Sequence, residues 1–447
     1  MTRDMTTGSP LKQILSFCVP LLFGNLFQQF YNMADSIIVG KFLGVNAFAA
    51  VGATGSVNFF IVGFALGLCS GIAIPISQDF GAGDYESMRR CTAHCVYLCI
   101  GITVFLTTAM YFGTYPLLEL LQTPPDIIDE AFSYIFTIFM GISATILYNM
   151  TAAVLRAIGD SRTPLYFLIL SSMVNIGLDY LFVGVWHFGV AGAAYATVIA
   201  QAISGLLCLA TILKRYALLR LEKRHWHFSF ECALRELGIG VPMGLQFSIT
   251  AIGSITLQSA VNTLGSGVVA AISAAAKVQN IIVSPMESVG AAMATYCGQN
   301  LGAGKIDRVR LGIRQMTAIT ALYALVGFLI AKFAGATVAL LFIDAQQKAI
   351  LGRIGQFLYC NALAYIPLSL IFVYRNSLQG LGFSNAAMLA GLAELIGRVI
   401  IAFCFVGSYG FDAVCFANPL AWIFADLLLL PLYAVAIRRL TRTRQQR

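Results

Sequence analysis

Charged residues are scarce in this sequence. Only 11% of the 447 residues are Asp, Glu, Lys or Arg, and 59% are hydrophobic, whereas soluble domains carry roughly 25% charged residues. The mean hydropathy is +0.81. A soluble fold would need helices with one polar face, which most of the apolar segments lack. These shortages exclude an ordinary soluble protein and indicate a polytopic membrane protein.

Signatures of enzymes and of cofactor binding are missing as well. The sequence contains no GxSxG, no HExxH and no nucleotide-binding fingerprint, so an enzyme or an ATP-driven machine is not expected from this chain alone. Its 11 cysteines form no CxxC pair and imply no disulfide framework. No cofactor is expected, and no metal beyond Na⁺ as a candidate coupling ion.

Apolar stretches of about 20 residues, the length that spans a bilayer, occur repeatedly along the chain. Turn signals separate them, among them GAGD at 81–84, TPPD at 123–126 and GDSRTP at 159–164. The fold class predicted is an all-α integral membrane protein with twelve transmembrane helices. The predicted spans are residues 13–39, 47–75, 91–113, 129–155, 164–186, 189–213, 236–264, 268–296, 312–333, 350–377, 384–407 and 411–437.

The distribution of Lys and Arg predicts the orientation. With the N-terminus inside, 22 of the 28 Lys and Arg residues fall on the inner side, whereas the outer side has few, such as Lys41, Lys332 and Lys348. The positive-inside rule then predicts two cytoplasmic termini in a multi-pass plasma-membrane protein. A nucleic-acid partner is not expected, because the basic residues occupy short loops beside helix ends instead of one soluble face.

An internal repeat divides the sequence into two halves of six helices. Because six is an even number, both halves enter the membrane in the same sense, which implies a pseudo-two-fold axis along the membrane normal. The matching motifs, 221 to 223 residues apart, are Val-Pro at 19–20 and 241–242, QDFGAGD at 78–84 and QNLGAGK at 299–305, LRAIGDS at 155–161 and LQGLGFS at 378–384, and GVAGAAYA at 189–196 and GFDAVCFA at 410–417.

This organisation is typical of a transporter, with a site between two halves that opens to each side in turn. The predicted domains are residues 1–213 as an N-terminal six-helix bundle that carries the cation site, 214–235 as a basic cytoplasmic linker, 236–437 as a C-terminal six-helix bundle, and 438–447 as a basic cytoplasmic tail.

Polar residues form a stripe on the first predicted helix. Within FGNLFQQFYNMADSIIVG at 23–40, Asn25, Gln28, Asn32 and Asp35 recur at spacings of three and four residues, so they share one helix face. An acid facing lipid would cost a few kcal/mol, so this face should meet protein or a water-filled cavity. A purely local role for Asp35, as a helix cap or a partner of Lys41, remains the alternative.

Three further polar residues lie at a similar predicted depth. Asn175 and Asp179 are four residues apart on the fifth predicted helix, and Thr197 lies on the sixth. With a rise of about 1.5 Å per residue, Asp35, Asp179 and Thr197 all fall about 7–12 Å below the outer ends of their helices. Two carboxylates with amide and hydroxyl oxygens suit Na⁺, and two close carboxylates equally suit a proton. Structural hydrogen bonding between helices is the alternative for Asn175 and Thr197.

The chain resembles the multidrug and toxic compound extrusion (MATE) family. The resemblance rests on MADSIIVGKFLG in the first helix, on the QDFGAGD, QNLGAGK and LRAIGDSRTP loops, and on the two six-helix halves. It implies a V-shaped pair of bundles that exports organic, often cationic compounds in exchange for inward H⁺ or Na⁺. In the DinF-like branch of that family the matching residues form the cation site, which here would be Asp35, Asn175, Asp179 and Thr197.

The second half lacks acids at the positions that match this site, so the ion site is predicted in the N-terminal half only. It carries other charged residues instead, namely Lys277, Glu287, Glu394 and Arg398. Glu394 and Arg398 have the i, i+4 spacing of an internal ion pair. A coupling or substrate-binding role for Glu287 or Lys277 is the alternative.

The function predicted is a secondary active antiporter that exports organic, cationic or amphipathic compounds by alternating access. Its partners would be a small-molecule substrate and membrane lipid, and the chain is expected to work as a monomer. One alternative is a flippase for a lipid-linked saccharide, and another is an intramembrane acid–base enzyme. The side chains predicted to line the substrate path are Phe27, Gln28, Asn32, Phe59 and Tyr148.

Overall fold

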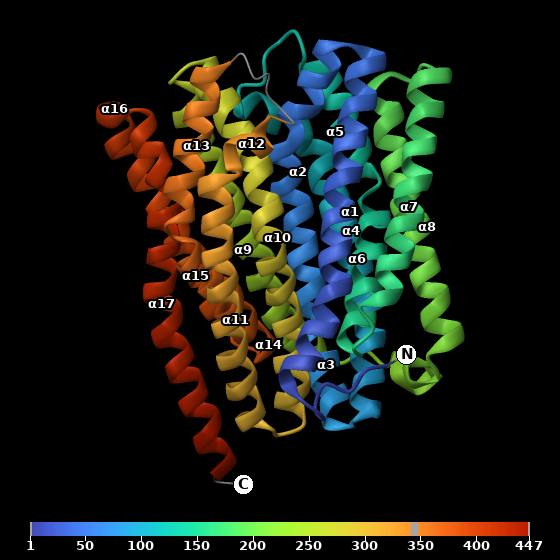
Figure 1. Ribbon diagram of the computed structural model, residues 1–447. Helices are drawn as coiled ribbons and strands as arrows, with labels where there is room; N and C mark the ends of the chain where they lie inside the picture. The colour runs from blue at the N-terminus through green and yellow to red at the C-terminus, as the bar shows by residue number, and fades with distance from the viewer. Residues whose placement is uncertain (1, 341–346, 446–447) are drawn as a thin grey trace. The chain divides into compact units, whose positions relative to one another are not determined.

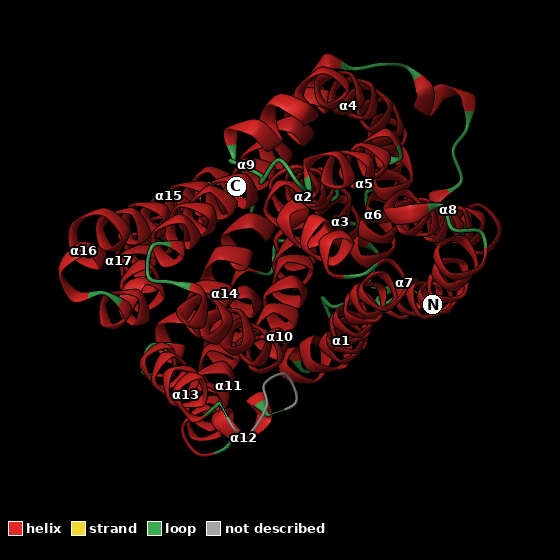
Figure 2. Ribbon diagram, turned by 90° about the horizontal axis from the view of Figure 1, so that it is seen from above, coloured by secondary structure: helices red, strands yellow, loops and turns green. Residues whose placement is uncertain are grey.

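The computed structural model describes residues 2–340 and 347–445, and within these ranges it contains helices and loops but no strand (Figures 1 and 2). Helices suit a membrane because they satisfy every backbone polar group internally. The α-helices are α1 (Pro10–Leu43), α2 (Val45–Ile72), α3 (Ile74–Ala82), α4 (Tyr85–Leu120), α5 (Ile128–Met140), α6 (Ile142–Ala157), α7 (Arg162–Asp179), α8 (Gly189–Arg215), α9 (Phe230–Asn262), α10 (Ser266–Gly302), α11 (Ile306–Phe333), α12 (Gly335–Ala339), α13 (Lys348–Ala362), α14 (Tyr365–Gly380), α15 (Ser384–Ile400), α16 (Val406–Tyr409) and α17 (Phe411–Gln445).

Ten stretches of these helices are each long and apolar enough to cross a membrane, and two bent pairs pass the same criterion jointly. The pair α5 and α6 bends by 48°, and the pair α13 and α14 bends by 53°. Counting each bent pair as one span gives twelve, the number predicted from the sequence. The all-helical membrane fold class is therefore confirmed.

The break between α5 and α6 coincides with a close contact to α8. It falls at Gly141, where a Cβ atom would lie 2.3 Å from the side chain of Val198 on α8. Only glycine permits this close packing, and its weak helix propensity also favours an interruption there. The sequence analysis predicted one continuous helix over 129–155 and did not foresee the bend.

The chain folds as two compact units of about six spans each. The first unit comprises Val19–Gly244 with the residues up to Asp4, and the second comprises Met5–Cys18 with Leu245–Arg447. Two helices are therefore divided between the units, α1 just before Pro20 and α9 just after Pro242. The predicted domains differ here, since they assigned residues 5–18 to the first bundle and 236–244 to the second.

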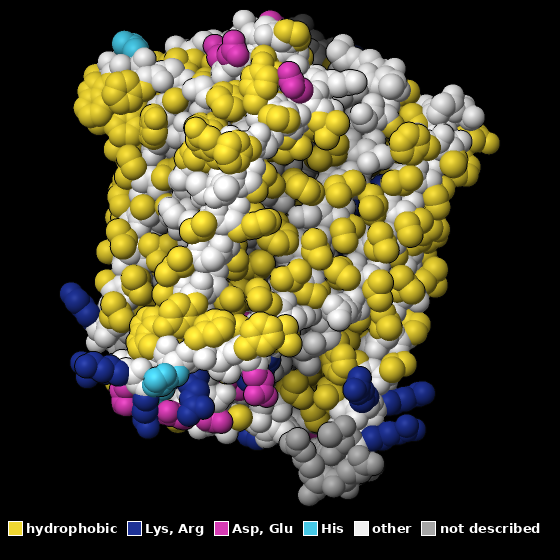
Figure 3. Space-filling view, turned by 180° about the vertical axis from the view of Figure 1, so that it is seen from behind, with side chains coloured by type: hydrophobic (Ala, Val, Ile, Leu, Met, Phe, Trp, Pro, Cys, Tyr) yellow, Lys and Arg dark blue, Asp and Glu magenta, His cyan; other side chains and the backbone are white. Residues whose placement is uncertain are grey.

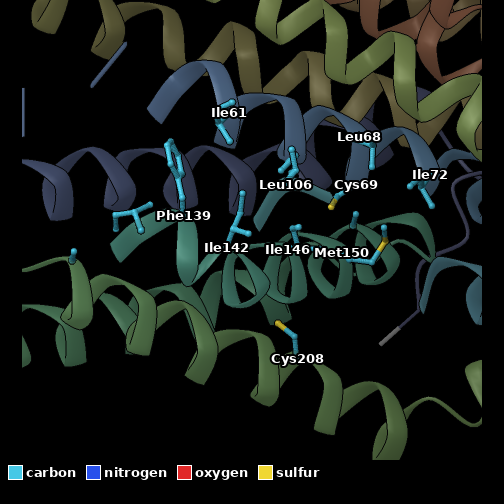
Figure 4. Close-up of a cluster of buried hydrophobic side chains, with 14 of the residues drawn as sticks. Ile61, Leu68, Cys69, Ile72, Leu106, Phe139, Ile142, Ile146, Met150 and Cys208 are labelled. Atoms are coloured by element: carbon cyan, nitrogen blue, oxygen red, sulfur yellow. The ribbon is translucent and has the colours of Figure 1, made fainter. Parts of the chain in front are cut away.

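The core of the first unit is a continuous apolar cluster contributed by α2, α4, α5, α6 and α8. Figure 4 shows part of it, with Ile61 and Leu68 of α2 and Ile142, Ile146 and Met150 of α6 among its labelled side chains. The second unit has a separate core drawn from α10, α13, α14, α15 and α17. Each unit thus buries its own apolar side chains.

The N-terminal segment of the chain is held by the second unit. The side chain of Gln299 accepts a hydrogen bond from the Met5 backbone N–H at 2.9 Å, and Asn300 donates to the Met5 carbonyl at 3.2 Å. Lys305 donates to the Thr6 carbonyl at 2.9 Å, and Arg308 donates to the Gly8 carbonyl at 2.8 Å. The QNLGAGK motif therefore anchors the start of the chain.

The two GAG motifs form tight turns. Gly83 and Gly304 both have positive φ, 73° and 66°, a left-handed conformation that glycine adopts without strain. Asp84 then caps α4 by accepting a hydrogen bond from the Ser87 N–H at 2.9 Å. These turns agree with the sequence analysis.

Surface composition fits a membrane environment. On the face drawn in Figure 3, hydrophobic side chains dominate the flanks of the helices and Lys and Arg gather near helix ends. Helix α17 continues through Gln445, so most of the predicted basic tail 438–447 is helical; residues 446 and 447 lie outside the described ranges. The V shape implied by the family resemblance concerns the placement of the two units and stays a prediction.

Candidate functional site

Two carboxyl groups from different helices meet inside the first unit. Asp35 lies on α1 and is 7% exposed, while Asp179 is the last residue of α7 and is 0% exposed. Their side chains lie close enough to interact directly, and two carboxyl groups in contact can share one proton as a hydrogen bond. A π-helical segment, Tyr180–Val185, follows Asp179 directly, and such wide turns often occur at functional positions of helices.

Asn175 and Thr197 complete this group. Asn175 is fully buried on α7. With its amide nitrogen toward Asp179, it donates to Asp179 Oδ2 at 3.2 Å and its oxygen accepts from the backbone N–H of Thr197 at 3.3 Å, which satisfies both neighbours. The structure therefore brings together all four residues predicted as the cation site, from α1, α7 and α8.

Two tyrosines belong to the same group and were missed by the sequence analysis. Tyr31 hydrogen-bonds to Thr197 and interacts electrostatically with Asp35 and Asp179, and Tyr134 of α5 interacts with both carboxyl groups as well. Tyr31 precedes Asp35 by four residues, so its place on the same helix face was a usable signal. Tyr134 lies on an apolar helix and gave no comparable signal.

The pair of carboxyl groups has no countercharge in the part of the chain that the structure describes. Asp35 and Asp179 take part in none of the salt bridges among the described residues, and one oxygen of each, Oδ1, has no hydrogen-bond partner there. A buried carboxylate without a partner is costly, so this group of oxygens favours binding of a small cation or a proton. We refer to Asp35, Asp179, Asn175 and Thr197 together as the carboxyl site.

The predicted substrate-lining residues fall into two groups. Phe27, Gln28 and Asn32 are exposed side chains of α1 on the approach to Asp35, and Phe59 is an exposed side chain of α2. Tyr148 instead lies near Arg156 and Cys208. The exposed residues have the accessibility that substrate contact requires, and their role stays a prediction.

The charged residues of the second half form an ion-pair network inside the second unit. Glu394 of α15 accepts from Arg375 of α14 at 3.0 Å and from Arg398 at 3.4 Å, and all three side chains are largely buried. Arg398 also donates to Asn418 of α17 at 3.3 Å. Glu287 of α10 interacts electrostatically with Arg375. Lys277 is exposed on α10.

One acid of this network was missed by the sequence analysis. Asp426 of α17 is 8% exposed, interacts electrostatically with Glu394, and has one oxygen without a hydrogen-bond partner among the described residues. The repeat offset pairs it with Ser204, so the search for symmetric acids had no reason to single it out.

A helical membrane bundle that buries an oxygen-rich carboxyl site defines the class of secondary transporters. The chain belongs to the MatE family, that is, the multidrug and toxic compound extrusion transporters, whose family model matches residues 20–181 and 242–404. The two matched stretches begin 222 residues apart, at the two prolines of the repeated Val-Pro motif. Membership of this family makes the chain an efflux transporter and not an enzyme.

Curated relatives and solved structures agree with this family. The chain is 34% identical over 310 residues to a probable multidrug resistance protein, YpnP, of Bacillus subtilis, covering 68% of each chain. It is 30% identical over 321 residues to a second such protein of that organism, YoeA, covering 70% of this chain and 69% of the relative. A solved structure of MATE in the bent conformation shares the fold with a TM-score of 0.89, 24% identity and 98% coverage of both chains.

Proposed function

We propose that this chain exports organic cationic or amphipathic compounds in exchange for an inward-moving cation, with the carboxyl site as the place where that cation binds. The observation that carries the proposal is the contact of Asp35 with Asp179, two buried carboxyl groups on different helices that form no salt bridge within residues 2–340 and 347–445. Such a site changes its charge whenever a cation enters or leaves.

The coupling follows from that change of charge. A cation that enters from outside reduces the negative charge of the site and removes the repulsion between the two carboxylates, so α1 and α7 pack together at a lower electrostatic cost. When the cation leaves, the two carboxylates repel each other and the packing of α1 against α7 is weakened. The substrate-binding state of the transporter is therefore linked to occupancy of the site.

Between H⁺ and Na⁺, the direct approach of the two carboxyl groups favours H⁺. One proton shared by Asp35 and Asp179 replaces the repulsion of two carboxylates by a hydrogen bond and needs no further ligands. Na⁺ would instead need several oxygen ligands around it, which the oxygens of Asn175 and Thr197 offer. Efflux measured under separate H⁺ and Na⁺ gradients distinguishes the two ions.

The substrate class is argued from relatives and from exposed side chains. Two relatives are described as probable multidrug resistance proteins, and Phe27 and Phe59 are large apolar side chains at 37% and 44% exposure. Aromatic faces attract cations as well as apolar compounds. We therefore expect Phe27, Gln28, Asn32, Phe59 and Tyr148 to contact the exported compound.

The membrane topology and the branch of the family are also part of the proposal. The excess of Lys and Arg on the inner side supports a plasma-membrane protein with two cytoplasmic termini. The chain is proposed to act as a monomer. The presence of acids in the first unit, with none at the matching second-half positions, supports the DinF-like branch.

A flippase for a lipid-linked saccharide is less well supported. That function calls for a strongly cationic cavity, whereas Arg375 and Arg398 are both paired with Glu394. The carboxylate of Glu394 therefore offsets one of these two positive charges within the second unit.

The proposal is tested in vesicles with a fluorescent organic cation. We expect an inward H⁺ gradient to drive efflux by the wild type, Asp35→Asn to lose it, and the control Asp129→Asn, which alters an exposed acid of α5, to keep it. Efflux driven by a Na⁺ gradient alone would identify Na⁺ as the coupling ion. Efflux that persists in Asp35→Asn at equal protein level would refute the carboxyl site as the coupling site.

A further inference from the structure

The first segment of α9, from Phe230 to Gly244, packs tightly into the first unit although the helix continues into the second. A Cβ atom on Gly71 of α2 would lie 2.6 Å from the Cα atom of Gly240, so the two backbones are in direct contact. A Cβ atom on Gly244 would lie 2.9 Å from the carbonyl oxygen of Phe64. This segment links the packing of the first unit to a helix of the second.

A salt bridge fixes the segment to α3. Arg235 donates to both oxygens of Asp79, at 3.1 Å and 3.4 Å, and also to Gln78 at 3.2 Å. Asp79 accepts a further hydrogen bond from Ser87 of α4 at 2.7 Å. Asp79 is therefore neutralised by Arg235 and well supplied with hydrogen bonds.

Glu236, the next residue, has none of these partners. Its side chain is 0% exposed, and neither of its carboxyl oxygens has a hydrogen-bond partner among the described residues. The thiol of Cys91 on α4 lies beside Glu236 and interacts with it, but its hydrogen bond within 3.5 Å goes to Asp79 Oδ2. Arg235 directs its guanidinium group at Asp79, so it forms no salt bridge with Glu236 among the described residues.

Among the described residues, the one cation that interacts with Glu236 is Arg235, whose guanidinium group is engaged with Asp79. The ionisable groups that interact with it are Asp79 from α3, the thiols of Cys91, Cys95 and Cys99 from α4, and Arg235 from its own helix. An ionised carboxylate at this place would be buried and unpaired, which costs several kcal/mol. In the packed arrangement Glu236 must therefore carry a proton.

The internal repeat shows that packing does not require an acid here. At the offset of 222 residues fixed by the two Val-Pro motifs, Glu236 corresponds to Ile14 on α1. Ile14 is likewise 0% exposed, and it lies in the segment of α1 that packs into the second unit. An apolar side chain thus fills the equivalent position, so the carboxyl group has a role beyond filling space.

We propose that Glu236 is a second proton-exchanging group, and that its protonation governs the packing of the first segment of α9 against α3 and α4. With the proton bound, the neutral carboxyl group stays buried. When the proton passes to water, the resulting carboxylate must reach solvent, and the segment loosens from the first unit. In the topology proposed above, this exchange occurs on the cytoplasmic side, at the opposite end of the unit from the carboxyl site.

The test reads out packing and does not depend on transport. The purified chain in lipid nanodiscs is treated with N-ethylmaleimide over a range of pH, and alkylation of the buried Cys91 is quantified by mass spectrometry. Thiol reactivity rises with pH in every variant, so the informative quantity is the alkylation rate of the wild type divided by that of Glu236→Gln, which cannot ionise.

We expect this ratio to rise several-fold with increasing pH. The control Glu231→Gln alters an exposed acid on the same segment, and its alkylation rate divided by that of Glu236→Gln should rise equally. Glu236→Ile, which introduces the side chain found at Ile14, should behave like Glu236→Gln and should fold. A ratio that stays near one across the pH range would overturn the proposal. Because transport is not measured, a rising ratio with no ion-driven efflux would refute the proposed function and leave this inference intact.

Discussion

In the first unit Asp35 and Asp179 interact directly and have no cationic partner among the described residues, whereas in the second unit Glu394 is held between Arg375 and Arg398. Both arrangements bury carboxyl groups in a helical bundle, but only the second supplies the opposite charge within the protein. The first unit must take its positive charge from solution. The contrast teaches that a buried acid is available for ion coupling when the fold provides no countercharge.

Removing one acid of the carboxyl site should have the largest effect. We expect Asp179→Asn to reduce ion-driven efflux to background, because a single remaining carboxyl group no longer needs to share a proton. The melting temperature should stay the same or rise, since an unpaired buried acid has been removed. Efflux and thermal unfolding of the purified protein check the two expectations. Ion-driven efflux that persists in Asp179→Asn would show that the carboxyl site of the first unit is not the coupling site.

Breaking the ion-pair network of the second unit should mainly reduce stability. Glu394→Gln removes the carboxylate that pairs with both Arg375 and Arg398 and leaves their buried charges poorly compensated, which is expected to cost about 3–5 kcal/mol of unfolding free energy. Replacing all three residues by apolar ones of similar size should restore most of the loss. Denaturant titration in detergent measures both. An unchanged unfolding free energy for Glu394→Gln would mean that the network does not stabilise the unit.

A third carboxyl group, Asp160 in the loop between α6 and α7, sharpens the comparison because hydrogen bonds take the place of a countercharge. Burial acts to raise the pKa of Asp160, but hydrogen bonds from Thr163 and Tyr216 outweigh it and hold this pKa below its ordinary value. A lowered folded pKa stabilises the fold above the unfolded pKa of about 3.9, and this stability is lost as pH falls through the folded value.

Asp160→Asn should therefore cost about 2 kcal/mol at neutral pH. The difference from the wild type should shrink as the pH falls below about 4. Thermal unfolding of the two proteins across this range checks the expectation. A difference that persists undiminished in acid would show that the charge of Asp160 is not what stabilises the loop.

Tyr31 should have the smallest effect of the four. Tyr31→Phe removes a hydrogen bond to Thr197, worth about 1 kcal/mol, so the affinity for the coupling ion should fall about fivefold. The ion concentration at half-maximal efflux measures this change. Tyr195→Phe, which alters an exposed tyrosine of α8, is the matched control, and equal shifts in both variants would exclude a specific role for Tyr31.

Much of the fold could be predicted because lipid imposes strict rules on sequence. Apolar runs gave the spans, and the GAGD and GAGK signals gave the turns at Gly83 and Gly304. The break at Gly141 could not be predicted, because it depends on contact with Val198, 57 positions further along the chain. Assignment of residues 5–18 to the second unit likewise depends on hydrogen bonds to distant partners.

The site was predicted where helical spacing and depth gave the same answer. Asp35, Asn175, Asp179 and Thr197 were found because each is polar within an apolar helix at a similar depth. Tyr134 was missed because a tyrosine is common in such helices. Asp426 was missed because its repeat partner is Ser204, and Glu236 because an acid near a helix end normally reaches water. Only the packing shows that Glu236 is enclosed by α3 and α4.

The exchange of helix segments between the units constrains how the protein is made. Met5 binds Gln299, which lies 294 residues later in the chain, so during synthesis the N-terminal segment waits for its partners until α10 has been translated. A chain cut in the 216–229 loop would yield two fragments, each lacking a piece of its own bundle and carrying a piece of the other. We therefore expect the fragments to fold together by co-expression and to be degraded when either is made alone.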